Sequence, residues 1–138
     1  MEFRTSTHIN APVERVWEIL TNVEHWPEWT RSMSTVKRLD QGPLTVGSRA
    51  RITQPKLPTV VWQVTELKPL QSFSWTARGL GITSVADHQL TNTDGGTDVT
   101  LVLRQTGPLS AVVRVISGEL TRRYLEMEAQ GLKQRSES

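Results

Sequence analysis

One of the three histidines, His88, and the only tyrosine, Tyr124, are the residues best placed for acid–base chemistry. His88 alternates with Ala86 and Leu90, so its side chain is expected on the same buried face of a strand. An imidazole titrates near neutral pH and can act as a general acid or base beside an apolar pocket. Tyr124 follows a helical apolar pattern, where its ring can pack while its hydroxyl reaches into a pocket. The two form a candidate catalytic pair, although a hydrogen-bonded wall residue is the commoner role of a buried histidine.

Five tryptophans could contact a ligand or build the core: Trp17, Trp26, Trp29, Trp62 and Trp75. Trp17 lies on the apolar face of a short helix and is expected to be a core anchor. Trp26 and Trp29 flank a proline and either pack a helix junction or line the mouth of a cavity. Trp62 and Trp75 are in phase with apolar strand neighbours, which predicts a buried face. There they either fill the core or contact a flat, apolar ligand.

Several other chemistries find no support in the sequence. The chain has no cysteine, which excludes disulfides, thiolate nucleophiles and cysteine-based metal sites. Its three histidines are far apart and lack metal-ligand spacing, so no metal and no cofactor are expected. Neither a glycine-rich phosphate loop nor a nucleophile elbow is present.

A length of 138 residues predicts a single domain, and the scattered charge gives no sign of a nucleic-acid partner. The net charge is +2, from 16 basic and 14 acidic residues that are scattered along 138 positions. Phosphate binding usually needs a clustered basic stripe, so no nucleic acid is expected. No apolar run approaches the roughly 18 residues of a membrane span, and a secretory h-region is missing, which favours the cytoplasm. We expect one domain over residues 1–134 and a flexible tail over 135–138.

Strand and helix signals then give the elements that must position these side chains. An alternating strand over 2–10 leads through Pro12 into a short helix with apolar residues at Val13, Val16, Trp17 and Leu20. Turn residues separate the later strands, and Asp94-Gly95-Gly96 predicts a hairpin between the last two. The expected strands cover 33–40, 47–54, 59–67, 71–78, 82–90 and 97–106.

The period changes after Leu109, which predicts one amphipathic helix of about 24 residues. Its apolar face is expected to carry Val112, Ile116, Leu120 and Tyr124, spaced four residues apart. The predicted fold is α+β: a curved antiparallel sheet of six to seven strands wrapped on a long C-terminal helix, with two short helices after the first strand. A cleft between such a sheet and its helix is a common small-molecule site.

Short motifs in this order resemble the START/Bet v 1-like (SRPBCC) superfamily, in particular its bacterial polyketide cyclase/dehydrase-type branch. The motifs are Ala11 to Trp17, Trp26-Pro27-Glu28-Trp29, Val46 to Arg49, Trp62 to Glu66, Phe73-Ser74-Trp75 and Gly95-Gly96-Thr97. The resemblance spans nearly the whole chain and implies a helix-grip fold with a deep hydrophobic cavity. It implies no single activity, because such proteins include lipid and hormone carriers, aromatic cyclases and co-chaperone-like regulators.

The leading hypothesis is that the chain binds a small hydrophobic molecule, lipid-, aromatic- or polyketide-like, between sheet and helix. The expected contact residues are Trp26, Trp29, Trp62, Trp75, His88, Ile116, Leu120 and Tyr124. One alternative is a polyketide cyclase or dehydratase that uses His88 and Tyr124 as acid–base groups. Another is a protein-interaction or regulatory module with a vestigial cavity. Monomer and homodimer both remain open.

Overall fold

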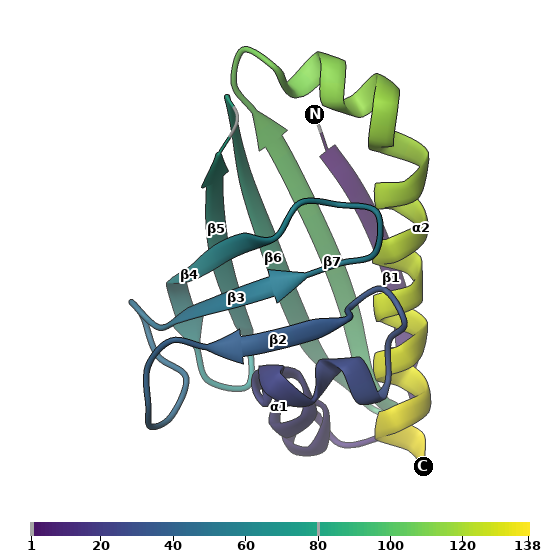
Figure 1. Ribbon diagram of the computed structural model, residues 1–138. Coiled ribbons are helices and arrows are strands. Elements are labelled where there is room, and N and C mark those ends of the chain that lie inside the picture. The colour runs from purple at the N-terminus through teal and green to yellow at the C-terminus, as the bar shows by residue number, and fades with distance from the viewer. Residues whose placement is uncertain (1, 80) are drawn as a thin grey trace.

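One antiparallel sheet of seven strands forms the body of the protein (Figure 1). The computed structural model describes residues 2–79 and 81–138. Along the sheet the strands follow the order β1-β7-β6-β5-β4-β3-β2. Their bounds are β1 (Glu2–Ile9), β2 (Thr35–Arg38), β3 (Arg49–Thr53), β4 (Val60–Lys68), β5 (Ser72–Gly79), β6 (Ile82–Thr93) and β7 (Gly96–Thr106). All seven expected strands are present, and β2 is the one most shortened relative to its prediction.

Three helical segments cover one face and one end of this sheet. They are α1 (Val13–Thr21), the 3₁₀ segment η1 (Val23–Glu28) and α2 (Ser110–Glu137). In Figure 1, α2 runs the length of the molecule beside β1, and its last turns lie near α1. The curved sheet, the long C-terminal helix and the short helices after β1 confirm the predicted α+β helix-grip fold. Within the described residues, no helix combines the length and apolarity needed to cross a membrane.

The hairpin between β6 and β7 was predicted from the Asp94-Gly95-Gly96 turn, and both of its strands extend closer to the turn than expected. Thr93 pairs with Gly96, so Asp94 and Gly95 alone form the turn. Gly96 has φ +140°, and a Cβ there would lie 2.2 Å from the carbonyl oxygen of Ile9. A glycine is therefore required where the end of β1 crosses this turn.

The apolar face of α1 confirms the helical spacing read from the sequence. Val13, Val16 and Leu20 are buried in the core cluster. Trp17 packs against that cluster, edge-on to Phe73 with ring centroids 6.5 Å apart. Trp17 is therefore the core anchor that its position predicted.

The last residues of the chain belong to α2, where a flexible tail over 135–138 was expected. The Arg15 guanidinium donates to the main-chain oxygens of Arg135, Ser136 and Ser138 at 2.6–3.2 Å. These are carbonyls that a helix end leaves without internal partners. The Arg135 guanidinium also lowers the pKa of the Glu28 carboxyl below its ordinary value. Contacts from α1 and η1, between 107 and 121 residues away in sequence, thus extend the helix beyond its apolar pattern.

The C-terminal half of α2 contacts the backbone of Trp29, the residue that follows η1, without an intervening side chain. A Cβ built on Gly131 would lie 2.0 Å from the carbonyl oxygen of Trp29. That oxygen belongs to the backbone, so it cannot rotate away as a flexible side chain could. Gly118 differs, because a Cβ there would meet the side chain of Arg114 at 3.3 Å.

Replacing Gly131 with alanine should push α2 away from Trp29, at the end of η1. A forced backbone shift of this kind costs about 1–3 kcal/mol, which corresponds to a melting temperature lower by roughly 3–10 °C. Gly118→Ala is the matched control in the same helix and should be neutral or stabilising by up to about 1 kcal/mol. Thermal unfolding followed by circular dichroism measures both variants. Equal shifts in the two would contradict the close contact at Gly131.

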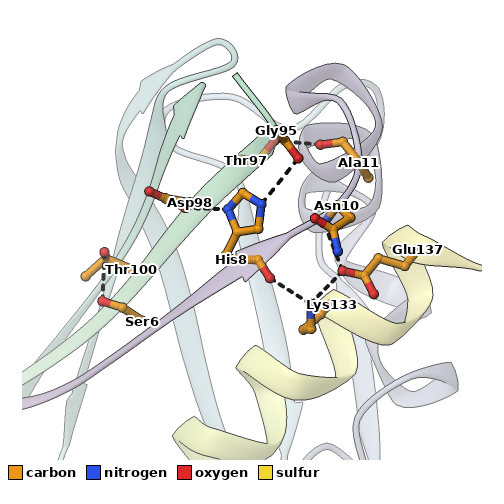
Figure 2. A network of polar contacts seen from close by, with 10 residues as sticks. All are labelled: Ser6, His8, Asn10, Ala11, Gly95, Thr97, Asp98, Thr100, Lys133 and Glu137. Atoms are coloured by element: carbon orange, nitrogen blue, oxygen red, sulfur yellow. Dashed lines mark hydrogen bonds and ion pairs between the residues drawn. The ribbon is translucent and has the colours of Figure 1, made fainter. Parts of the chain in front are cut away.

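A polar network fastens the end of β1 to its neighbours (Figure 2). His8 Nδ1 lies 2.7 Å from Asp98 Oδ1, and Nε2 lies 3.3 Å from the carbonyl oxygen of Gly95. Both oxygens are acceptors, so both ring nitrogens donate only when the imidazole is protonated. The Lys133 ammonium donates to the His8 carbonyl oxygen and to Glu137, whose carboxylate accepts from the N–H of Asn10.

The hydrogen bond to Asp98 raises the pKa of His8 above its ordinary value of 6.5. A raised pKa in the folded state means that the stabilisation is complete below pH 6.5. It is lost as the pH rises through the folded value. An NMR titration of the His8 ring should show a pKa above 6.5, and Asp98→Asn should return it toward 6.5. Titration of wild-type His8 at or below 6.5 would contradict the doubly bonded geometry.

Candidate ligand-binding site

A cavity of about 290 Å³ lies between the sheet and α2. Its walls come from β3 to β7, from the β3–β4 loop, from η1 and the loop after it, and from one face of α2. Most of the lining is apolar, including Met33, Ile52, Leu57 and Leu101, while Ser84 and Gln105 add polar groups. The helix-grip fold therefore encloses a mainly apolar space with a few polar side chains, as small-molecule sites usually do.

Five of the eight predicted contact residues line this cavity: Trp26, Trp62, Trp75, His88 and Tyr124. Trp26 is fully buried, and its indole N–H donates to the carbonyl oxygen of Leu20 at 2.9 Å. Trp75 lies between the other two tryptophans, with centroid distances of 5.3 Å to Trp26 and 5.9 Å to Trp62. The bulk of the three indoles forms a wall that suits a flat, apolar molecule.

The other three predicted residues lie elsewhere. Trp29 packs against Gly131 and Trp26, and borders a separate hollow with Arg31 and Gln134. It therefore belongs to the helix junction, which was one of its two predicted roles. Ile116 is 76% exposed, and Leu120 is not among the lining residues.

The predicted inner face of α2 was wrong by about one residue in its first half. The residues that face the cavity are Val113, Ser117, Thr121, Tyr124, Leu125 and Glu128. This stripe carries hydroxyls and a carboxyl group, so an apolar pattern does not identify it. Thr121 satisfies its hydroxyl within the helix by donating to the Ser117 carbonyl oxygen at 2.8 Å. A polar side chain can therefore face an apolar space there at little cost.

His88 meets a carboxyl group that the sequence analysis did not single out. His88 Nε2 lies 3.5 Å from Glu128 Oε1, and the two residues are only 3% and 6% exposed. The signal was present in the sequence, because Glu128 follows Tyr124 at the same four-residue step that places Tyr124 after Leu120. Both His88 and Glu128 line the cavity, so they form its buried polar site.

The hydrogen bonds of His88 fix where its protons lie. His88 Nδ1 is 3.1 Å from the carbonyl oxygen of Phe73, which only accepts, so Nδ1 carries a proton. Phe73 also stacks on the imidazole at a centroid distance of 4.1 Å and thus fixes its plane. Nε2 then faces Glu128 favourably only if one further proton sits between them. That proton makes either an imidazolium–carboxylate pair or an imidazole–carboxylic acid pair.

Glu128 retains hydrogen-bonding capacity. Its Oε1 is buried and has no hydrogen-bond partner within the described residues, since 3.5 Å to Nε2 is long for a hydrogen bond. A buried acceptor without a partner costs about 1–3 kcal/mol. The site is therefore suited to a ligand hydroxyl or another donor that reaches this oxygen.

Tyr124 serves a different contact from the predicted pairing with His88. Its hydroxyl donates to the carbonyl oxygen of Pro55 at 2.6 Å. The bond ties the β3–β4 loop to α2 across one side of the cavity. His88 and Tyr124 both line the cavity without a hydrogen bond to each other in the described part of the chain, and the carboxyl group beside His88 is that of Glu128. Within the described residues, no group of three or more histidine, aspartate and glutamate side chains is arranged to hold a metal ion.

Solved structures share this fold at low sequence identity. The Zhui aromatase/cyclase from a Streptomyces species superposes with a TM-score of 0.82 at 13% identity, covering 99% of this chain and 93% of that one. A Thermus thermophilus protein gives 0.79 at 17% identity, covering 99% and 97%. The di-domain ARO/CYC protein StfQ of the steffimycin pathway gives 0.79 at 14% identity, covering 99% of this chain and 50% of that one. At these identities the likeness concerns the fold alone.

The family of the chain follows from its sequence, through a match to a family profile. No match was found among curated proteins. The profile of the family described as "polyketide cyclase / dehydrase and lipid transport" matches residues 1–137, almost the whole chain. The chain therefore belongs to the polyketide cyclase/dehydrase and lipid transport family.

Proposed function

We propose that the protein binds a small, flat, largely apolar molecule in the cavity between sheet and α2. The observation that carries this proposal is the wall of Trp26, Trp62 and Trp75 beside the buried pair of His88 and Glu128. A volume of about 290 Å³ is near the lower end of the range for small-molecule sites. The family description, which includes lipid transport, supports the same class of ligand. An open cavity also disfavours an interaction module whose cavity has collapsed.

The polar pair would select the orientation of the ligand. Apolar surface gains from burial anywhere along the cavity, so it fixes no direction. A hydroxyl on the ligand that reaches Glu128 Oε1 gains a hydrogen bond with a buried acceptor that otherwise has none within the described residues. We therefore expect a ligand with one polar edge and an apolar remainder.

Filling the cavity from the helix side should block binding. N-phenyl-1-naphthylamine, a flat fluorophore that brightens in apolar surroundings, serves as the probe. Ser117 lines the cavity, so Ser117→Phe should weaken probe binding by about tenfold or more, because the phenyl ring occupies the ligand space. Ile116→Phe is the matched control next to it, on the exposed face, and should bind as the wild type does.

The reverse pattern, with Ile116→Phe impaired and Ser117→Phe normal, would show that the other face of α2 lines the site. Circular dichroism spectra and melting temperatures of both variants confirm that each is folded. Native mass spectrometry of gently purified protein then tests for a ligand retained from the cell.

A dehydratase activity is the second candidate, favoured by the position of His88 and Glu128 side by side in the cavity, 3.5 Å apart. In a β-hydroxy ketone, the basic member of the pair would remove a proton from the carbon next to the carbonyl. The acidic member would donate its proton to the hydroxyl, so that the C–O bond breaks, a C=C bond forms and water leaves. Two titratable groups placed side by side in a water-poor site suit this exchange.

Turnover of aromatic β-hydroxy ketones such as 4-hydroxy-4-phenylbutan-2-one tests this candidate, because the product enone absorbs in the ultraviolet. Glu128→Gln and His88→Asn should each lower kcat by about 10²–10⁴-fold while probe affinity is retained. Tyr124→Phe, which removes the bond to Pro55, should keep most of the turnover. Unchanged turnover in the His88 and Glu128 variants would leave binding as the function.

A further inference from the structure

A cluster of exposed apolar side chains lies at the beginning of α2. Of the large apolar residues that are exposed within the described chain, four of seven lie between positions 109 and 116. They are Leu109, Val112, Val115 and Ile116, with Val115 87% and Ile116 76% exposed. Single exposed apolar residues are ordinary, but several within two helical turns mark a contact surface.

This cluster borders the end of the cavity where lining residues such as Pro58 and Gly79 are exposed, which we take as its mouth. Val113 and Ser117, on the same two turns, line the cavity from its helix side. The N–H of Leu109 donates to the carbonyl oxygen of Gly81 at 3.3 Å, so the β5–β6 connection adjoins the cluster. The β3–β4 loop supplies Leu57 and Pro58 to the same cavity. We call the described residues of three segments the mouth face: 53–61, 78–84 without residue 80, and 105–118.

The mouth face is basic. Its three segments contain Lys56, Arg78 and Arg114 but no aspartate or glutamate, in a chain with 14 acidic residues. The first turn of α2 also lacks an acidic residue, so the positive end of the helix dipole is not offset there. Nearby carboxylates have basic partners outside the mouth face: Glu2 pairs with Arg4 and Arg104, and Glu119 pairs with Arg122.

We propose that the mouth face docks on a membrane surface that contains anionic lipids. Exposed apolar residues on a helix enter the boundary between headgroups and acyl chains, and basic residues around them pair with lipid phosphates. Charge complementarity favours this partner, because a second copy of the chain would bring the same basic groups into opposition. The cavity would then open toward the bilayer, so that an apolar ligand could pass between them without crossing water. This last consequence rests on the proposed ligand-binding function, whereas the docking itself does not.

Co-sedimentation with vesicles tests the docking directly. Wild-type protein should bind vesicles of phosphatidylcholine with about 30% phosphatidylglycerol more tightly than pure phosphatidylcholine vesicles, and less tightly at high salt. Val115→Ser/Ile116→Ser should weaken binding to the anionic vesicles by about tenfold or more, since both inserted side chains become polar. Lys56→Glu and Arg78→Glu should each weaken it by about fivefold or more, which corresponds to about 1 kcal/mol per basic residue.

Two variants outside the mouth face provide matched controls. Val46→Ser changes an exposed valine, 58% accessible, on another loop, and Arg31→Glu reverses a charge beside the C-terminal half of α2. Both should bind vesicles as the wild type does. Equal losses in the controls and in Val115→Ser/Ile116→Ser would overturn the proposal, as would absence of wild-type binding to anionic vesicles at low salt.

Two further measurements separate this proposal from its rivals. Self-association that disappears in Val115→Ser/Ile116→Ser, without vesicle binding by the wild type, would assign the mouth face to a dimer and overturn the membrane proposal. Fluorophore binding in vesicle-free solution should persist in Val115→Ser/Ile116→Ser, because neither residue lines the cavity. Failure of docking and failure of ligand binding are thus distinguishable.

Discussion

The structure depends on how the C-terminal half of α2 is held. Gly131 lets the helix backbone approach the carbonyl oxygen of Trp29, and Arg15 binds the carbonyls of the last turn. The buried residues of α2 lie almost entirely between positions 128 and 136, with Gly118 the exception. Because the helix is fixed near one end of a curved sheet, its first half need not pack on the sheet. The cavity occupies the space that this arrangement leaves.

That cavity holds a buried polar pair, His88 and Glu128, which lowers the stability of the protein relative to an apolar pair. Burying a histidine and a glutamate costs solvation free energy that their mutual interaction at 3.5 Å only partly returns. Phe73 compensates in part, since its carbonyl accepts from His88 and its ring stacks on the imidazole. Glu128 Oε1 remains without a hydrogen-bond partner in the described structure. An apolar pair would fill the space more stably, so the polar pair is best explained by a ligand that completes it.

The sequence predicted the architecture better than the site, for a physical reason. Strand alternation, the Asp94-Gly95 turn and the spacing of Val13, Val16 and Leu20 are local features that burial confirms. The placement of His88 in the cavity followed from the same alternation. The inner face of α2 did not, because Ser117, Thr121 and Glu128 point inward while Ile116 points outward. The final turn was also missed, since distant Arg15 stabilises it.

The error in predicting which face of α2 points inward is itself informative about function. A helix that only covers an apolar cavity needs apolar residues inside and polar residues outside. The first turns of α2 nearly reverse this order, with Ser117 on the inner face and Val115 and Ile116 on the outer one. Lining the cavity does not require the outer residues to be apolar, so they need a separate explanation. The absence of acidic residues from the whole mouth face points the same way, because covering a cavity imposes no sign of charge on its rim. A negatively charged apolar boundary outside the protein accounts for both features.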